Sequence, residues 1–172
     1  MGTLAPVLIM MTPRSGSSLI ARIFHEHGLW VGRTHNKPGY PSFENIELQQ
    51  RIRILWTAER HGIEGLHKYK SSKSVNDLRQ IVDEIVPPNT PWLFKTGIDS
   101  WPIWKDYGAR YVFIRRDLES MVRSTVRRNG DGPDRVRRII RARVEFMDRL
   151  SLEHDIPIVD TDKVMAGDFE SL

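Results

Sequence analysis

The segment at residues 6–24, PVLIMMTPRSGSSLIARIF, constrains the fold of this chain more than any other. An apolar run leads into a turn rich in Ser and Gly, and apolar residues then recur at helical spacing. This order is typical of a buried strand that passes through a phosphate-binding loop into a helix. Such loops usually carry a lysine before the last Ser or Thr, but here Ser17 stands at that position and Arg14 is the cation of the loop.

Without that lysine, the loop can still bind an anion. Backbone amides at residues 15–18 would open a helix, and the dipole of the helix favours negative charge there. The guanidinium of Arg14 could form bidentate hydrogen bonds with anionic oxygens, while the hydroxyl of Ser17 or Ser18 could donate further hydrogen bonds. The alternative is a turn of Ser and Gly that only caps the helix.

Three further apolar segments predict strands, namely WLFK at 92–95, YVFIR at 111–115 and IPIVD at 156–160. Like the run at 6–11, they are continuous rather than alternating, which is typical of strands covered on both faces. Segments with helical patterns lie between them. The sequence therefore predicts one α/β domain over residues 1–172, a three-layer sandwich with a mostly parallel central sheet of about four to five strands.

Apolar residues recur at helical spacing in five segments, within 19–24, 52–56, 75–85, 118–126 and 136–150. Ser74 and Asp77 resemble a capping box at the start of the third segment. Two segments, 31–45 and 62–74, predict irregular loops, because the first is rich in Gly, Pro and Asn and the second is polar and basic.

Composition excludes several classes of site. The chain has no cysteine, which rules out disulfides, thiolate catalysis and zinc sites built on cysteine. Its longest apolar run, Val7–Met11, is far too short to span a bilayer, and no basic segment precedes it as in a signal peptide. We therefore expect a cytoplasmic protein without a membrane span.

Arginine is concentrated in one part of the chain, because residues 110–149 hold twelve arginines and six acidic residues. This excess indicates either an anionic ligand or a solvated helix face. The stretch at 135–143 is not expected to bind nucleic acid, since its apolar residues fit a core-facing stripe and no aromatic platform interleaves with them.

A second landmark is YVFIRRDLESMVRSTVRRNG at residues 111–130. The predicted strand ends in Arg115 and Arg116, and Ser124 follows eight residues after Arg116 on the next predicted helix. A guanidinium at the carboxyl end of a strand and a hydroxyl on the following helix can converge on one phosphate. The alternative is an arginine in a salt bridge and a serine on the helix surface.

Together and in this order, PRSGSS at 13–18 and the pair of Arg116 and Ser124 resemble the cofactor motifs of the sulfotransferases that use 3′-phosphoadenosine 5′-phosphosulfate (PAPS). NKPGYPSFENIEL at 36–48 is similar to the NPxGYxE segment of bacterial members, and WLFKTGIDSWPIW at 92–104 is similar to their strand that ends near a lysine. The resemblance implies a fold like that of P-loop-containing nucleotide hydrolases. It also implies transfer of a sulfuryl group from PAPS to a hydroxyl or amine, with PAP as the product and no metal ion.

The resemblance also implies roles for individual residues. The 5′-phosphosulfate would be held by Pro13, Arg14, Ser15, Gly16, Ser17 and Ser18, and the 3′-phosphate by Arg116 and Ser124. Arg14 and Lys95 would neutralise charge at the sulfuryl group. Glu44 would be the general base, with His35 and Asp99 as further candidates, although Glu44 could instead be an acidic residue favoured at a helix N-terminus.

Two features depart from the family pattern. Lys95-Thr96-Gly97 stands where cytosolic small-molecule sulfotransferases have Lys-Thr-His, so their catalytic histidine is absent. Some members also supply a late Arg-Lys-Gly segment to the 3′-phosphate, and the sequence has none after IPIVDTDKVMAGDFESL. Arg127, Arg128 or the basic loop Lys68–Lys73 could replace it.

The acceptor would be a small molecule or a glycan, and Trp92, Trp101 and Trp104 could either line its pocket or pack in the core. Two other functions stay open from the sequence. A P-loop kinase for a small metabolite would need a lysine in the loop and a carboxylate for Mg²⁺. A non-catalytic PAP-binding module would keep the fold without the chemistry.

Overall fold

The computed structural model describes residues 3–37, 40–54, 56–59, 68–71 and 75–168 of the chain. Its centre is a four-stranded parallel sheet, made of β1 (Val7–Met11), β6 (Leu93–Gly97), β7 (Arg110–Arg115) and β8 (Ile158–Asp160). The strands lie in the order β6-β1-β7-β8. The predicted strands at 6–11, 92–95, 111–115 and 156–160 are thereby confirmed, as is the α/β class with a parallel sheet.

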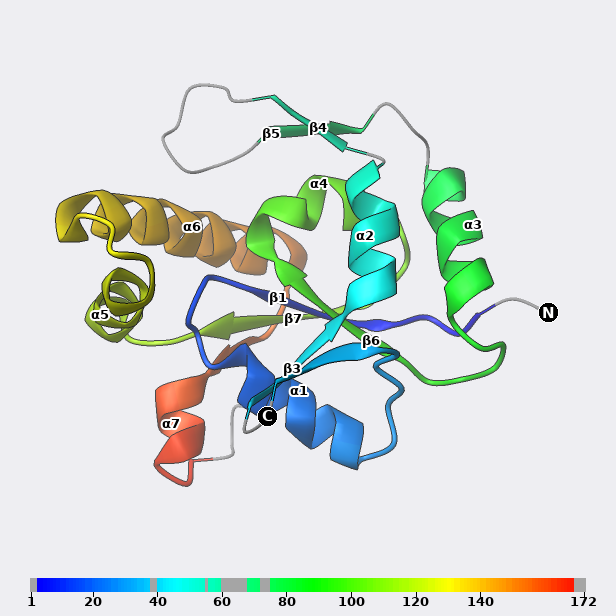
Figure 1. The fold of residues 1–172 in the computed structure, drawn as a ribbon, viewed down its shortest axis with the longest axis horizontal. Coiled ribbons are helices and arrows are strands. Elements are labelled where there is room, and N and C mark those ends of the chain that lie inside the picture. The colour runs from blue at the N-terminus through cyan, green and yellow to red at the C-terminus, as the bar shows by residue number, and fades with distance from the viewer. Residues whose placement is uncertain (1–2, 38–39, 55, 60–67, 72–74, 169–172) are drawn as a thin grey trace.

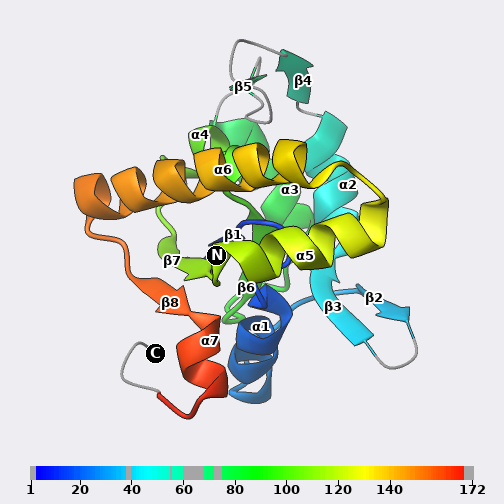
Figure 2. The ribbon, with the colours of Figure 1, turned by 90° about the vertical axis from the view of Figure 1, so that its left-hand side faces the viewer.

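Helices cover both faces of this sheet (Figure 1). One face carries α2 (Ile46–Ile54), α3 (Val75–Ile85), α4 (Trp101–Trp104) and α6 (Pro133–His154). The other face carries α1 (Ser17–Glu26) and α7 (Thr161–Met165). The remaining helices are the short 3-10 turn η1 (Ile98–Ser100) and α5 (Leu118–Asn129), which packs against α6 as a helical hairpin (Figure 2). This arrangement agrees with a three-layer sandwich.

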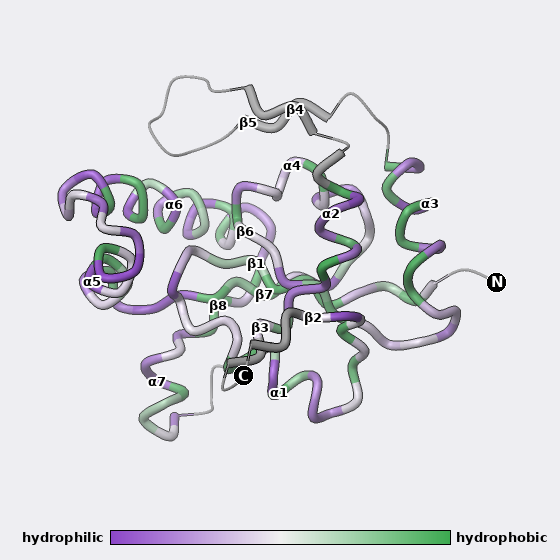
Figure 3. Tube along the Cα trace, in the orientation of Figure 1, coloured by the Kyte–Doolittle hydropathy of each residue, from purple (hydrophilic) through white to green (hydrophobic). Residues whose placement is uncertain are grey.

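A hydrophobic core lies on each face of the central sheet. Strand β1 contributes side chains to both cores because successive side chains of a strand point to opposite faces. Leu8 and Met10 pack in the larger core, and Ile9 packs in the smaller core against α1. All residues of the strand from Leu8 to Met10 are fully buried, as expected for a strand between two helical layers. The covering helices are amphipathic, and hydrophobic and hydrophilic residues alternate along α6 (Figure 3).

Two short hairpins lie outside the central sheet. Strands β2 (Thr34–Lys37) and β3 (Tyr40–Asn45) pair antiparallel, as do β4 (Trp56–Glu59) and β5 (Lys68–Ser71). The prediction of irregular loops at 31–45 and 62–74 is therefore wrong over these strands. Neither segment alternates in hydrophobicity, and the ladder of β2 and β3 has a register shift between Thr34 and Asn36.

The second helical stripe was predicted to extend to Trp56, but α2 ends at Ile54 and Trp56 begins β4. Ser74, the first residue of the predicted capping box, lies outside the described residues. In the part of the chain that the structure covers, no helix is both long enough and apolar enough to cross a bilayer.

The carboxyl ends of the four parallel strands meet at one edge of the sheet. Met11 is in register with Gly97 on one side and with Ile114 on the other. The chain runs from β1 to β6 on one side of the sheet and then crosses to β7 on the other, so the strand order reverses at β1. In open parallel sheets, ligands bind outside the carboxyl ends at such a switch point.

Candidate functional site

A cleft of about 700 Å³ opens at this switch point. The residues that line it come from the end of β1, the loop after it and the start of α1, from β3, from β6 and η1, from the residue after β7, and from helices α5 and α6. They are Met11, Pro13, Arg14, Ser15, Gly16, Ser17, Ser18, Ser42, Glu44, Lys95, Gly97, Asp99, Arg116, Ser124, Arg128 and Arg143. The structure thus brings all residues assigned to the two cofactor motifs, together with Glu44 and Lys95, into one cleft.

The loop after β1 has an unusual backbone. Gly16 precedes α1 with a φ of 82°, and Arg14 has a φ of 65° although it is not a glycine. A Cβ atom on Gly16 would lie 2.9 Å from Thr161 Oγ1, so the position requires glycine for space as well as for conformation. Arg14 holds a conformation that costs an ordinary residue about 1 kcal/mol or more, and such positions cluster at ligand sites.

Two hydroxyls of the loop, those of Ser15 and Ser17, have weak partners or none. Ser15 is fully buried, and no described residue accepts a hydrogen bond from its Oγ. Ser17 Oγ donates to Met11 Sδ over 2.7 Å, and a thioether is a weak acceptor. The amides of Ser17 and Ser18 begin α1 and have no acceptor within the helix. This loop therefore offers several donors to an anion.

The side chain of Arg14 connects the two predicted motifs. Its Nε atom donates a hydrogen bond of 2.9 Å to Ser124 Oγ on α5. The loop after β1 and the helix after β7 thus meet across the switch point. Both Nη groups of Arg14 have no hydrogen-bond partner among the described residues, so the guanidinium can bind an anion in the cleft and keep its contact with Ser124.

The segment after β8 forms hydrogen bonds with Arg116 and with the residue that follows it. Its Nε donates to Asp162 Oδ1 over 2.9 Å, and the Asp117 amide donates to Asp162 Oδ2 over 2.9 Å. The buried Thr161 hydroxyl donates to the Ser15 carbonyl over 2.7 Å and lies 3.2 Å from the Arg115 carbonyl. Thr161 therefore connects the loop after β1 with the end of β7 through hydrogen bonds.

Lys95 is almost fully buried, with 2% of its side chain exposed. Its ammonium donates to Ser18 Oγ over 2.9 Å and to the Ser42 carbonyl, and it pairs with Glu44 Oε1 at 3.2 Å. These three acceptors match its three N–H donors. Burial lowers the pKa of Lys95 below its ordinary value of 10.5, and the charge and hydrogen bond of Glu44 oppose this shift. A ligand oxygen could reach the ammonium by replacing Ser18.

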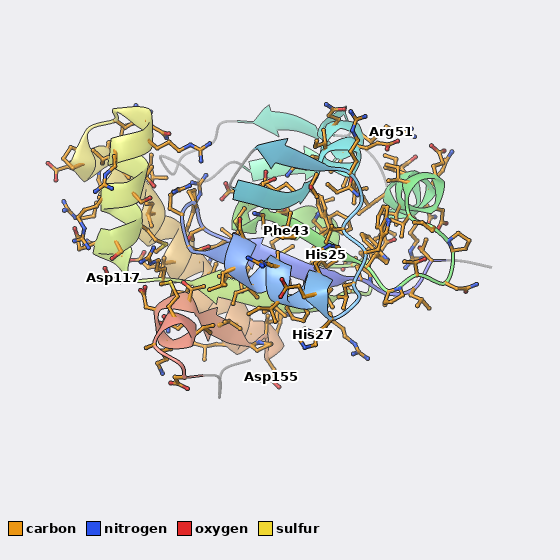
Figure 4. All side chains as sticks on the ribbon, turned by 60° about the horizontal axis from the view of Figure 1, so that its bottom comes forward. His25, His27, Phe43, Arg51, Asp117 and Asp155 are labelled. Atoms are coloured by element: carbon orange, nitrogen blue, oxygen red, sulfur yellow. The ribbon has the colours of Figure 1, made fainter. Side chains whose placement is uncertain are left out.

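A kink in β3 places Glu44 in the cleft. Phe43 has a φ of 52° and buries its ring against His25, with 5.7 Å between the ring centroids (Figure 4). The residues on either side of it, Ser42 and Glu44, both line the cleft. Glu44 keeps 29% of its side chain exposed, so its carboxylate is accessible to a molecule in the cleft while it pairs with Lys95.

The other two candidates for a base differ from Glu44. Asp99 lines the cleft, but both of its carboxylate oxygens accept from Arg143, Oδ1 over 3.1 Å and Oδ2 over 2.6 Å. This bidentate contact occupies lone pairs that a base would use. His35 lies in β2, and its side chain is outside the described part of the structure.

Sequence reasoning missed several residues at the site. Thr161 and Asp162 follow a predicted strand, but nothing in their spacing indicates contacts with the loop after β1 or with Arg116. Arg143 is one arginine among many on α6. The three tryptophans proposed for an acceptor pocket, Trp92, Trp101 and Trp104, are buried in the larger core instead, and none lines the cleft.

No protein-family model matches the chain, and no curated protein matches it either. The resemblance to sulfotransferases therefore rests on the sequence motifs alone. Among the described residues, no group of three or more His, Asp and Glu side chains is placed to hold a metal ion.

Proposed function

We propose that this chain is a sulfotransferase that transfers the sulfuryl group of PAPS to a hydroxyl or amine of a small-molecule or glycan acceptor. One observation carries the proposal. The residues of both cofactor motifs line a single cleft, and Arg14 joins the two motifs through its hydrogen bond to Ser124. The cleft lies at the carboxyl edge of a parallel sheet, where nucleotides bind to folds of this kind.

The donors of the cleft fit the charge of the nucleotide. In the proposal, residues 13–18 hold the 5′-phosphosulfate through the amides that begin α1, the hydroxyls of Ser15 and Ser17, and the guanidinium of Arg14. Ser124 and the terminal amino groups of Arg116 hold the 3′-phosphate. PAPS supplies an activated sulfuryl group in this scheme, and the side chains of the cleft supply position and charge.

Glu44 acts as the general base in the proposed reaction. It takes the proton of the acceptor hydroxyl or amine while the acceptor atom forms its bond to sulfur. The bond between sulfur and the 5′-phosphate oxygen breaks at the same time, and its electron pair stays on PAP. Arg14 and Lys95 neutralise the charge that develops on these oxygens. Because side chains carry this charge, chelators are expected to leave turnover unchanged.

The first experiment is a thermal unfolding measurement with PAP, ADP and ATP–Mg²⁺ in parallel. A ligand at a hundred times its dissociation constant stabilises a protein by about 2.7 kcal/mol, which is a readily measured shift. We expect PAP to stabilise most strongly. Stabilisation by ATP–Mg²⁺ that equals or exceeds that of PAP would replace the proposal with a kinase, and no stabilisation by PAP would remove it.

Turnover distinguishes an enzyme from a non-catalytic PAP-binding module. The assay follows transfer of radiolabelled sulfuryl groups from PAPS to a panel of sugars, phenols and amines. Transfer to at least one class that depends on Glu44 supports the enzyme. Strong PAP binding with no transfer to any acceptor, and no hydrolysis of PAPS above background, supports the module.

A further inference from the structure

The cleft has two sides, because β6 and β7 flank β1 in the sheet. The residues assigned to the 3′-phosphate lie on the β7 side, just after that strand and on α5. The β6 side is lined by residues of β3, β6, η1 and α6, namely Ser42, Glu44, Lys95, Gly97, Asp99 and Arg143. Because Glu44 belongs to this side, an acceptor that gives its proton to Glu44 has to bind here.

Gly97 leaves open space on the β6 side. Its backbone is extended, with a φ of −68° and a ψ of 149°, a conformation that any residue adopts. A Cβ atom there would meet no atom of the described residues within 4 Å, so packing does not require glycine either, in contrast to Gly16. Residues two positions apart in a strand point to the same face, so a side chain at position 97 would project beside that of Lys95. Its absence enlarges the cleft next to the reacting groups.

An ion pair lines the same side of the cleft two residues further along the chain. Arg143 donates to both carboxylate oxygens of Asp99, and 15% of the Arg143 side chain and 12% of the Asp99 side chain stay exposed. Each oxygen of Asp99 keeps a second lone pair, and the Nη1 group of Arg143 has no partner among the described residues. The pair therefore offers hydrogen-bond acceptors and a donor together to a molecule in the cleft.

The described charges on this side of the cleft balance one another, because Glu44 pairs with Lys95 as Asp99 pairs with Arg143. An ammonium group at the second pair is attracted by Asp99 and repelled by Arg143, and a carboxylate group meets the reverse. A hydroxyl meets no such opposition, since it donates to a carboxylate and accepts from a guanidinium. This side therefore favours a neutral molecule that carries hydroxyls.

The lining of the cleft also has few apolar groups. Among the described residues that line it, none is aromatic, and Met11 and Pro13 are the larger apolar ones. A flat aromatic acceptor would cover polar side chains with its ring faces and leave their hydrogen bonds unmade. The lining therefore suits a polar ring better than a phenol.

We propose that Gly97, Asp99 and Arg143 form the acceptor subsite and select a neutral sugar ring with neighbouring hydroxyls. One hydroxyl faces Glu44 and receives the sulfuryl group, while its neighbours form hydrogen bonds with Asp99 and Arg143 in the space beside Gly97. The inference rests on the proposed function, and it narrows the acceptor from hydroxyls and amines in general to the hydroxyls of an uncharged sugar.

The first test is the acceptor preference of the wild type. Transfer of radiolabelled sulfuryl groups from PAPS is measured with the methyl glycosides of glucose, galactose and mannose, with 2-naphthol and with cyclohexylamine. We expect the best glycoside to have a kcat/KM at least roughly tenfold above those of the phenol and the amine. A preference for 2-naphthol or cyclohexylamine would overturn the inference and leave the proposed function intact.

The second test fills the open space with Gly97→Val. The matched control is Gly132→Val, because Gly132 is also extended, with a φ of −64° and a ψ of 132°, has room for a Cβ atom and does not line the cleft. Gly97→Val should raise the KM for the best glycoside by roughly tenfold or more and leave the Kd of PAP within about twofold. The control should change neither by more than about twofold. Equal effects of the two variants on KM would contradict the inference.

The third test replaces the ion pair as a unit, with Asp99→Leu and Arg143→Met in one protein. Removing both charges leaves neither of them buried alone, so this variant is expected to fold, and its melting temperature verifies this. The KM for the best glycoside should rise by roughly tenfold or more, while the KM for 2-naphthol should not rise. An equal rise for both acceptors would show that the pair only maintains the shape of the cleft and would overturn its role in selection.

A wild type that binds no PAP or transfers no sulfuryl group would defeat the proposed function, and sugar binding then tests the subsite by itself. The shift in melting temperature caused by the three methyl glycosides is compared between the wild type and the double variant. The general effect of a sugar on the solvent is common to both proteins. A larger shift of the wild type would support the subsite, and equal shifts would overturn it.

Discussion

The Nε atom of Arg14 donates to Ser124 Oγ over 2.9 Å, although 110 residues separate the two in the sequence. One residue belongs to the loop that begins α1 and the other to the helix that follows β7. Because these two residues are in contact, the loop after β1 and helix α5 are separated by no more than the length of one arginine side chain. Anions bound on either side of Arg14 would share its charge, which would favour a ligand with two separate phosphate groups.

Replacement of Arg14 by glycine should separate the binding role of this residue from its structural role. Arg14→Gly removes the guanidinium but keeps a φ of 65° accessible. Relief of backbone strain opposes two losses, the hydrogen bond to Ser124 and the added freedom of the unfolded chain. The free energy of unfolding should therefore fall by no more than about 1–2 kcal/mol. PAP affinity should fall by roughly tenfold or more. Calorimetry and urea unfolding measure the two quantities.

The control for this variant is Asn89→Gly. Asn89 also has a positive φ, of 56°, and lies in an exposed turn away from the cleft. Its replacement should leave PAP affinity unchanged. A PAP affinity of Arg14→Gly equal to that of the wild type would show that the guanidinium does not bind the nucleotide.

Gly16→Ala should destabilise the protein more than an alanine at another glycine with positive φ. A Cβ atom at position 16 meets Thr161 Oγ1 at 2.9 Å, whereas one at Gly28, with a φ of 93°, meets nothing within 4 Å. Both variants carry the backbone cost of about 1–2 kcal/mol. Gly16→Ala should lose about 1–3 kcal/mol more because Thr161 is fully buried and must shift. Urea unfolding of both variants tests this difference, and equal losses would contradict the packing of α7 on the loop.

Glu44→Gln should lower turnover without weakening PAP binding. The amide retains the size of the side chain but cannot take a proton, so the rate should fall by roughly a hundredfold or more if proton transfer is part of the limiting step. The matched control is Glu47→Gln, which removes the same charge from an exposed position in the first turn of α2. Equal turnover of Glu44→Gln and wild type, with chemistry limiting, would exclude Glu44 as the base.

The sequence was sufficient to predict the central sheet, and the residues of the two motifs come together in one cleft at its edge. Continuous apolar segments such as 111–115 are typical of parallel strands, and parallel strands end at one edge. Residues placed just after such strands, Arg14 and Arg116 among them, must therefore lie near one another. This reasoning needs only local patterns, which is why it succeeded.

The parts that failed depend on contacts between distant segments. Strands β2 and β3 are stabilised by their ladder and by the packing of β3 on α1 and β6, and their sequences carry no alternating pattern. The partners of Asp162 and Arg143 could not be chosen from sequence either. Each is one charged residue among many, and an ion pair leaves no periodic signal.

The stability of the protein should depend on pH through Lys95. Because burial lowers the pKa of this lysine in the folded state, the folded protein binds a proton there less tightly than the unfolded chain does. The free-energy cost of burying the charged ammonium is fully present below the pKa of Lys95 in the folded state. This cost disappears as the pH rises through that pKa toward the ordinary pKa of 10.5. Lys95→Met removes the titrating group and hence this dependence.

Urea unfolding of wild type and Lys95→Met between about pH 8 and about pH 11 measures the effect. All other titrating groups are common to both proteins, so the difference between their free energies of unfolding isolates Lys95. We expect the wild type to gain stability relative to Lys95→Met as the pH rises. A difference that is flat or falls with pH would mean that the pair with Glu44 outweighs burial and keeps the ammonium charged at no cost. The charged Lys95 would then stabilise the folded protein rather than destabilise it.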